Sequence, residues 1–292
     1  MHALNRSPVA EYRLQSGSLT ALCRCTARMA IRSLHGELCL YPKPGLVSLV
    51  DNGSHHDMTA ATFLRSMFSL RRYFYDITVA GAEGAGFDAL KRLAIAAERR
   101  MLVATGGINT HRGAIFSSGL LCAAIGRLHG QSLAVFAPAI RATLLSEWGP
   151  ALARHTLTND ADSNGRQAAR LHAASGAREE AAKGLPAVFE VALPALRRTL
   201  AAGRTVDLAR IDALFALMAH VSDTNVYHRG GALGATLVRQ HARRFIERGG
   251  TARSDWQAEA LACHEKFVER RLSPGGAADL LAATCLVQMA CA

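Results

Sequence analysis

The sequence lacks several features that would each point to a particular class of protein. No stretch approaches the roughly 20 uninterrupted apolar residues that a membrane-spanning helix needs. The start, from Met1 to Arg6, has no apolar run behind a basic end, so we see no signal peptide and expect a cytoplasmic protein. Aromatic residues are only 6% of the chain, but 50% apolar and 20% charged residues are typical of a folded, soluble protein.

Signs of β-structure and of a multi-domain chain are missing as well. No segment alternates apolar and polar residues as a strand does, and there is no internal repeat or low-complexity linker. Apolar residues instead recur at helical spacing, as Phe63, Met67 and Leu70 do at i, i+4 and i+7. We therefore predict an all-α fold, with a loose N-terminal leader over residues 1–17 and a single helical catalytic domain over residues 18–292.

Capping residues and helix breakers predict where the helices begin and end. Ser18, Asp207 and Ser273 are expected N-caps, with Pro274 as the first residue of the last helix. Pro194 should kink or divide the helix that contains it. The expected helices cover about 18–41, 59–75, 87–104, 112–129, 132–148, 176–183, 187–202, 207–221, 232–248, 255–271 and the segment from 273 onward.

Charge and cysteine usage narrow the function. The 34 basic and 23 acidic residues give a formal charge of +11, which suggests nucleic acid, an anionic membrane or a polyphosphate as partner. Lysine is scarce, because Lys43, Lys91, Lys183 and Lys266 are the only four and arginine supplies the rest. The 7 cysteines are scattered, and Cys23-Arg24-Cys25 has no second pair to complete a metal site, so buried free thiols are favoured.

One polar stretch lies between Gly106 and Gly113. It places Asn109, Thr110, His111 and Arg112 in succession, directly before an apolar run that should start a helix. Glycines let a backbone approach a ligand closely, and a helix start offers free N–H groups and a positive dipole end to an anion. An ordinary polar loop that caps a helix would look similar.

Three further junctions resemble that one, and the four polar clusters cover residues 51–57, 105–113, 222–231 and 273–279. Each holds Asp, Asn, His or Arg beside glycine, and each alone is also typical of helix capping. Together they predict one cleft at helix junctions, with carboxylates for Mg²⁺ and arginines and helix starts for phosphate. Glu98 lies at the edge of an apolar stripe, where a carboxylate needs a partner or a task.

These residues also carry a resemblance to a known family. The chain resembles the triphosphoribosyl-dephospho-coenzyme A synthase family over roughly residues 18–285. The matching motifs, in order, are Glu37-Leu38, Tyr41 to Ser48, His55 with Asp57-Met58, Ala97-Glu98 with Met101, Thr105 to Gly113, Asp223-Thr224-Asn225, His228 to Gly231 and Ser273 to Leu281. Arg112 stands where many members carry lysine, which keeps the charge but changes its geometry.

The resemblance implies a ribosyl transfer. The 2′-hydroxyl of 3′-dephospho-coenzyme A would attack the anomeric carbon of the ribose of ATP, and adenine would leave. The product would be a prosthetic-group precursor, passed through another transferase to the acyl carrier subunit of citrate lyase or malonate decarboxylase. The alanine- and arginine-rich composition slightly favours the latter.

Such a reaction needs a carboxylate near the cationic ribose, a proton for adenine and a grip on the triphosphate. The candidate catalytic residues are Glu98, Asp57, Asp223 and His111, with Glu98 the first choice for the base or for stabilising the oxocarbenium ion. The candidate ligands of the expected Mg²⁺ are Asp57, Asp223 and Asp279. The candidate substrate-binding residues are Lys43, His55, Asn109, Thr110, Arg112, Asn225, His228, Arg229, Ser273, Gly275 and Gly276.

Two other function classes fit parts of the sequence. An all-α metal-dependent phosphohydrolase acting on a nucleotide would also use His55-His56-Asp57, and it would release phosphate rather than adenine. A nucleic-acid-binding protein would explain the net charge, but the arginines are spread along the chain and the clusters mix both signs, which favours an enzyme. A homodimer is compatible with the sequence, which does not fix the oligomeric state.

Overall fold

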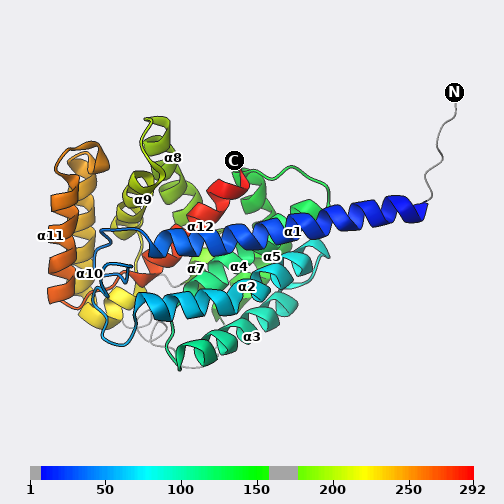
Figure 1. Cartoon of the computed structure of the whole chain (residues 1–292), viewed down its shortest axis with the longest axis horizontal. Helices are drawn as coiled ribbons and strands as arrows, with labels where there is room; N and C mark the ends of the chain where they lie inside the picture. Colours follow the sequence, from blue (N-terminus) through cyan, green and yellow to red (C-terminus); the bar gives the residue numbers. More distant parts are fainter. Residues whose placement is uncertain (1–7, 158–176) are drawn as a thin grey trace.

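The computed structural model describes residues 8–157 and 177–292. Over these ranges the chain folds into helices without a β-strand, which confirms the all-α prediction (Figure 1). The helices are α1 (Pro8–Leu38), α2 (Ala60–Ala82), α3 (Phe87–Thr105), α4 (Arg112–Gly130), α5 (Ala137–Leu157), α7 (Ala177–Ala182), the π-helix η1 (Ala187–Ala192), α8 (Leu193–Ala201), α9 (Val206–His220), α10 (Thr224–Glu247), the 3-10 helix η2 (Gly250–Ala252), α11 (Trp256–Glu269) and α12 (Gly275–Ala290).

Helix α12 lies at the centre of the molecule. It packs against α1, α4, α8, α9, α10 and η1, and it runs through the middle of Figure 1. Helices α10 and α11 pack together at one end, on the left of that view, while the N-terminal end of α1 projects from the other. No helix in the described ranges combines the length and apolar character required to cross a membrane.

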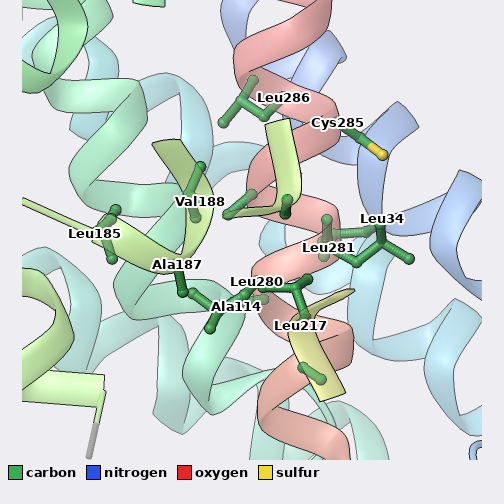
Figure 2. Close-up of a cluster of buried hydrophobic side chains, with 14 of the residues drawn as sticks. Leu34, Ala114, Leu185, Ala187, Val188, Leu217, Leu280, Leu281, Cys285 and Leu286 are labelled. Atoms are coloured by element: carbon green, nitrogen blue, oxygen red, sulfur yellow. The ribbon is translucent and has the colours of Figure 1, made fainter. Parts of the chain in front are cut away.

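The core forms where α12 meets its neighbours (Figure 2). Leu280, Leu281 and Leu286 of α12 are buried there. They are surrounded by Leu34 of α1, Ala114 of α4, Val188 of η1 and Leu217 of α9. A helix that is apolar on most of its faces is expected in the interior of a protein, so the composition of α12 explains its central place.

Helices α2 and α4 approach each other closely, because glycines stand at their crossing points. A Cβ atom on Gly126 would overlap the carbonyl group of Thr78, and one on Gly81 would overlap the carbonyl group of Ala123. Tyr73 on α2 donates a hydrogen bond from its hydroxyl to the Ile115 carbonyl at 2.8 Å. The two backbones are therefore in direct contact, which brings the start of α4 beside α2.

Several predicted helices are confirmed. Thr59 caps α2 by accepting a hydrogen bond from the Thr62 amide. Met67 and Leu70 are buried as the spacing predicted, and Phe63 is half-buried. The segment with Pro194 is divided as expected, because the π-helix η1 ends and α8 begins just before that residue. Helix α3 ends at Thr105, and the C-cap residue Gly106 adopts the left-handed conformation with φ of 67°.

Other predicted boundaries are wrong. Helix α1 begins at Pro8, before Ser18, and α5 covers Ala137–Leu157 rather than 132–148, since Ser132 has a positive φ of 58° and belongs to a turn. Thr205, not Asp207, caps α9 by accepting from the Leu208 amide. The predicted helix 187–202 is close to the observed range, because η1 and α8 together cover residues 187–201.

Two corrections concern the starts of α10 and α12. Helix α10 begins at Thr224 rather than at 232, because Asp223 supplies a cap, and Gly231 breaks the helix with φ of 58° and ψ of −158°. Ser273 does not cap α12, whose N-cap position is Pro274 and whose first residue is Gly275. The Ser273 hydroxyl is instead hydrogen-bonded to His55, at 2.8 Å from its Nε2.

The close contact of α2 and α4 predicts a specific loss of stability. Gly126→Ala should lower the free energy of unfolding by about 1–3 kcal/mol, because the new methyl group meets backbone that has no room to move. Chemical denaturation measures this change.

Gly149→Ala is a matched control, since its Cβ would meet only the Leu145 side chain, at 3.9 Å. It should be neutral or stabilising, because alanine favours a helix interior. Equal stability of the two variants would contradict the close packing of α2 on α4.

Candidate active site

A cavity of about 1300 Å³ lies where the starts of α4, α10 and α12 meet. Residues from all four polar clusters line it. They are His55 and Asp57, Asn109 to Gly113, Ser222 to Asn225 with His228 and Arg229, and Ser273, Gly275, Gly276 and Asp279. Side chains of α3 and α7 complete the wall, including Glu98 and Glu180.

The carboxylate of Asp223 joins two helices. Its Oδ1 accepts a hydrogen bond from the Asn225 amide at 2.9 Å and so caps α10. Its Oδ2 accepts from the Ala277 amide of α12 at 3.0 Å. Burial raises the pKa of Asp223, while four backbone N–H groups that point at the carboxylate oppose that rise.

Asp279 makes the corresponding link between α12 and α4. The Ala114 amide at the start of α4 donates to its carboxylate, and a Cβ on Gly113 would overlap that carboxylate. Only glycine fits at position 113, because the Asp279 carboxylate lies too close for a side chain. The pKa of Asp279 is raised well above its usual range, chiefly by desolvation and further by the nearby charges of Glu37 and Asp223.

Glu37 faces the cavity, and Lys43 is paired with it. Lys43 Nζ lies 2.6 Å from Glu37 Oε1, with side-chain exposures of 1% and 7%. Glu37 lines the cavity and Lys43 does not, so the described geometry gives Lys43 a carboxylate partner rather than an open position. Glu37 lies near the end of α1 and Lys43 in the segment that follows it. Lys43 can be buried because Glu37 neutralises its charge.

His55, Arg229 and Ser273 form a polar link between three segments. Arg229 Nη2 lies 3.0 Å from His55 Nδ1, and His55 Nε2 lies 2.8 Å from the Ser273 hydroxyl. Because a guanidinium can only donate, Nδ1 accepts and Nε2 carries the proton. Burial, followed by the charge of Arg229, lowers the pKa of His55 to about 4, so this histidine is neutral at pH 7.

Arg229 also holds the rim of the cavity together. Its Nη1 donates to the Ser54 carbonyl at 3.0 Å and to the Arg271 carbonyl at 3.4 Å. Asn225 lies beside the start of α12, since a Cβ on Gly275 would be 3.1 Å from its amide nitrogen. His228 is exposed on the cavity wall.

Glu98 and Arg112 form an ion pair on the cavity wall. Arg112 Nη2 lies 2.5 Å from Glu98 Oε1, with side-chain exposures of 46% and 30%. The Arg112 amide at the start of α4 is satisfied by the Asn109 side chain at 3.2 Å. The partner expected for Glu98 is thus Arg112, and Asn109 is occupied at the helix start.

His111 is the most buried of the predicted polar residues in the second cluster, with 3% exposure. Its Nδ1 lies 2.6 Å from the Ser66 hydroxyl, and the Thr110 hydroxyl donates to Ser66 at 2.7 Å. Its Nε2 is buried without a hydrogen-bond partner. Burial, followed by the charge of Lys43, lowers the pKa of His111 to about 3, so the ring is neutral.

Asp57 stands apart from the other carboxylates. Its side chain is 62% exposed, and its carboxylate lies 3.6 Å from Nδ1 of the neutral His55 ring. In the part of the chain that the structure describes, no three His, Cys, Asp or Glu residues lie close enough to hold a metal ion together. Mg²⁺, however, is usually bound by one or two carboxylates together with substrate phosphates, so a cluster of three protein ligands is not required for it.

Some residues in or near the cavity have no role predicted from the sequence. Glu37 is only part of a motif there, and Ser66 is not predicted at all. A serine between Phe63 and Leu70 on an apolar helix face does, however, indicate a buried polar contact. Lys91, Arg178 and Lys183 are further basic residues in the wall. They belong to segments without a recognisable motif.

A comparison with known protein families shows which family this chain belongs to. Residues 23–291 match the family model described as CitG: ATP:dephospho-CoA triphosphoribosyl transferase. The chain belongs to this family. No solved structure matches the chain.

Curated relatives in this family cover nearly the whole chain. A protein of Pectobacterium atrosepticum named 2-(5''-triphosphoribosyl)-3'-dephosphocoenzyme-A synthase is 37% identical, over 98% of this chain and 94% of that protein. Two proteins named as probable synthases of the same kind come from Acinetobacter calcoaceticus and Vibrio cholerae. The first is 38% identical, over 88% of this chain and 87% of its own length. The second is 36% identical, over 93% of this chain and 90% of its own length.

The raised pKa of Asp279 predicts a pH dependence of stability. A folded-state pKa above the unfolded value means that the folded protein binds the proton more tightly, so stability falls as pH rises above about 4 through the raised pKa. Asp279→Asn keeps an oxygen for the Ala114 amide and removes the ionisation. The variant should therefore lose less stability over this pH range than the wild type.

Melting temperatures measured between pH 4 and pH 8 test this. Asp207→Asn is the control, because the Asp207 side chain is 75% exposed and should leave the pH dependence as it is. An unchanged pH dependence in Asp279→Asn would show that Asp279 titrates normally.

Proposed function

We propose that this protein transfers the 5-triphosphoribosyl group of ATP to the 2′-hydroxyl of 3′-dephospho-coenzyme A and releases adenine. The observation that carries the proposal is the family match over residues 23–291, whose motifs come together around one cavity. The product would be 2′-(5″-triphosphoribosyl)-3′-dephospho-coenzyme A.

The size of the cavity suits two large substrates. Pockets for one drug-sized ligand are typically about 300–1,000 Å³, and this one is about 1300 Å³. Among the described residues, its wall carries five basic side chains, namely Lys91, Arg112, Arg178, Lys183 and Arg229. Two phosphate-bearing substrates would need several such groups.

The triphosphate would be held at the helix starts. Three N-termini, those of α4, α10 and α12, point their dipoles into this region, and phosphate is a favoured ligand of such sites. Asn225, Ser273 and Gly275 lie there with donor groups, whereas the Thr110 hydroxyl and the Gly276 amide already donate to Ser66 and Asp223. Fixing the triphosphate in this way would present the ribose carbon, rather than phosphorus, to the acceptor hydroxyl.

The carboxylates would act on the ribose and the acceptor. Breaking the bond to adenine builds positive charge on the ribose, which a nearby carboxylate stabilises. Asp223, Asp279 and Glu37 are acidic side chains that lie near one another in the cavity wall, and Glu98 is paired with Arg112. We assign to Glu98 the removal of the proton from the 2′-hydroxyl, since its oxygen is partly exposed to the cavity.

We also propose that Mg²⁺ binds the triphosphate. Asp223 and Asp279 would hold the ion together with phosphate oxygens. Asp57 is exposed at the cavity and would add only a nearby negative charge. The ion would supply charge neutralisation of the triphosphate.

The proposed product has a further destination. A triphosphoribosyl group on dephospho-coenzyme A is an activated form of a prosthetic group, and another transferase would attach it to an acyl carrier subunit of malonate decarboxylase or citrate lyase. This step lies outside the chain itself.

Adenine release tests the reaction. The purified protein, incubated with ATP, Mg²⁺ and dephospho-coenzyme A, should release free adenine and form a triphosphoribosylated product. Chromatography detects the first and mass spectrometry the second. Phosphate or ADP without adenine would overturn the proposal and favour a phosphohydrolase.

The role of Glu98 leads to a second prediction. Glu98→Gln should lower the rate of adenine release by about 10²–10⁴-fold, because general base catalysis contributes about that much. Single-turnover rates at saturating ATP measure the loss.

Glu147→Gln is a matched control. Glu147 pairs with Arg127 at 3.0 Å with 28% side-chain exposure, close to the 30% of Glu98, but it does not line the cavity. Its rate should stay within twofold or so of the wild type, as expected for a surface ion pair. A similar loss of rate in both variants would contradict the role of Glu98 as the base, because losing any ion pair of this kind would then have the same effect.

A further inference from the structure

His111 combines two properties that rarely occur together in a structural residue. It is 3% exposed, and its Nε2 is buried without a hydrogen-bond partner. An unsatisfied buried polar atom destabilises a protein by about 1–3 kcal/mol. The residue also lines the cavity, so a ligand in the cavity can supply the missing partner.

The proton on the His111 ring can be located from its neighbours. The Thr110 hydroxyl donates to Ser66 at 2.7 Å, so the Ser66 oxygen is already an acceptor. The hydrogen of Ser66 is then free to point at His111 Nδ1, 2.6 Å away. A neutral imidazole that accepts at Nδ1 carries its proton on Nε2.

The rest of the surroundings keeps the ring neutral and in place. The Phe63 ring contacts His111 edge to face, with centroids 5.0 Å apart, and the His111 amide donates to the Met101 sulfur at 3.3 Å. Burial and the positive charge of Lys43 both oppose a second proton. His111 is therefore suited to donating a hydrogen bond rather than to acid–base chemistry.

The position of His111 indicates which acceptor it would meet. It is the N-cap residue of α4 but makes no capping hydrogen bond with its side chain. The positive end of the α4 dipole lies at this place and favours an anion, while Arg112 and Lys43 are each paired with a glutamate. A phosphate oxygen satisfies both the charge and the unpaired N–H.

We propose that His111 binds a phosphate oxygen of the triphosphate through its Nε2–H, and that Ser66 and Thr110 are positioning residues that fix the proton there. This inference rests on the proposed function only for the identity of the ligand. It gives Ser66 a role that no motif assigns, and it makes His111 a binding residue instead of an acid or base.

The tautomer is tested first, on the wild-type protein. Nitrogen-15 NMR of histidine-labelled protein should show Nε2 of His111 protonated and Nδ1 unprotonated, with the resonance assigned by its loss in His111→Gln. Thr110→Val removes the hydroxyl that donates to Ser66 and should shift the signals toward a mixture of tautomers, while Thr110→Ser should not. A proton on Nδ1 in the wild type would overturn the inference.

Binding is tested with inorganic triphosphate by calorimetry. His111→Phe should weaken binding about ten- to hundredfold, the effect of losing a hydrogen bond to a charged group. His111→Gln should retain most of the affinity, because its amide can donate from a similar place. Adenosine binding should be the same in all three proteins.

The outcomes separate this inference from the proposed function, because neither measurement depends on adenine release. If His111→Phe binds triphosphate as tightly as the wild type, the inference is wrong even when the protein releases adenine. If adenine is not released but triphosphate binding requires His111, the proposed reaction fails and the phosphate contact stands. Should His111→Phe fail to fold, the wild-type tautomer and the Thr110 pair still decide.

Discussion

The fold depends on two buried carboxylates that join the starts of neighbouring helices. Asp223 caps α10 and accepts the Ala277 amide of α12, and Asp279 on α12 accepts the Ala114 amide of α4. Buried backbone N–H groups need partners, and here one helix supplies the partner for the next. This chain of contacts sets the three helix starts side by side, and the cavity is the space that they enclose.

The same contacts give the cavity its electrostatic character. Helix starts bring positive potential, and the carboxylates that cap them bring negative charge into the same few ångströms. Glu37 adds a third carboxylate, balanced by the buried Lys43. In the proposed reaction, the anionic triphosphate would lie at the helix starts and the ribose that becomes cationic would lie beside the acidic side chains.

Local chemistry explains how much could be predicted from the sequence. Helical spacing predicts α2, and the four polar clusters predict where the cavity wall is, because both signals lie within a few neighbouring residues. The start of α12 could not be predicted in this way, because its cap comes from Asp223, 54 residues away in the chain. The pairing of Lys43 and the link from Ser66 to His111 likewise depend on contacts between separate helices or segments.

The link made by Arg229 has a consequence for the thermodynamics of binding. One guanidinium contacts the Ser54 carbonyl, the Arg271 carbonyl and His55, so the rim of the cavity is ordered before any ligand arrives. Immobilising loose side chains or loops on binding opposes association by about 0.5–1.5 kcal/mol per side chain. A rim that is already fixed avoids much of that loss of conformational entropy, and more of the interaction energy is left to orient the substrates.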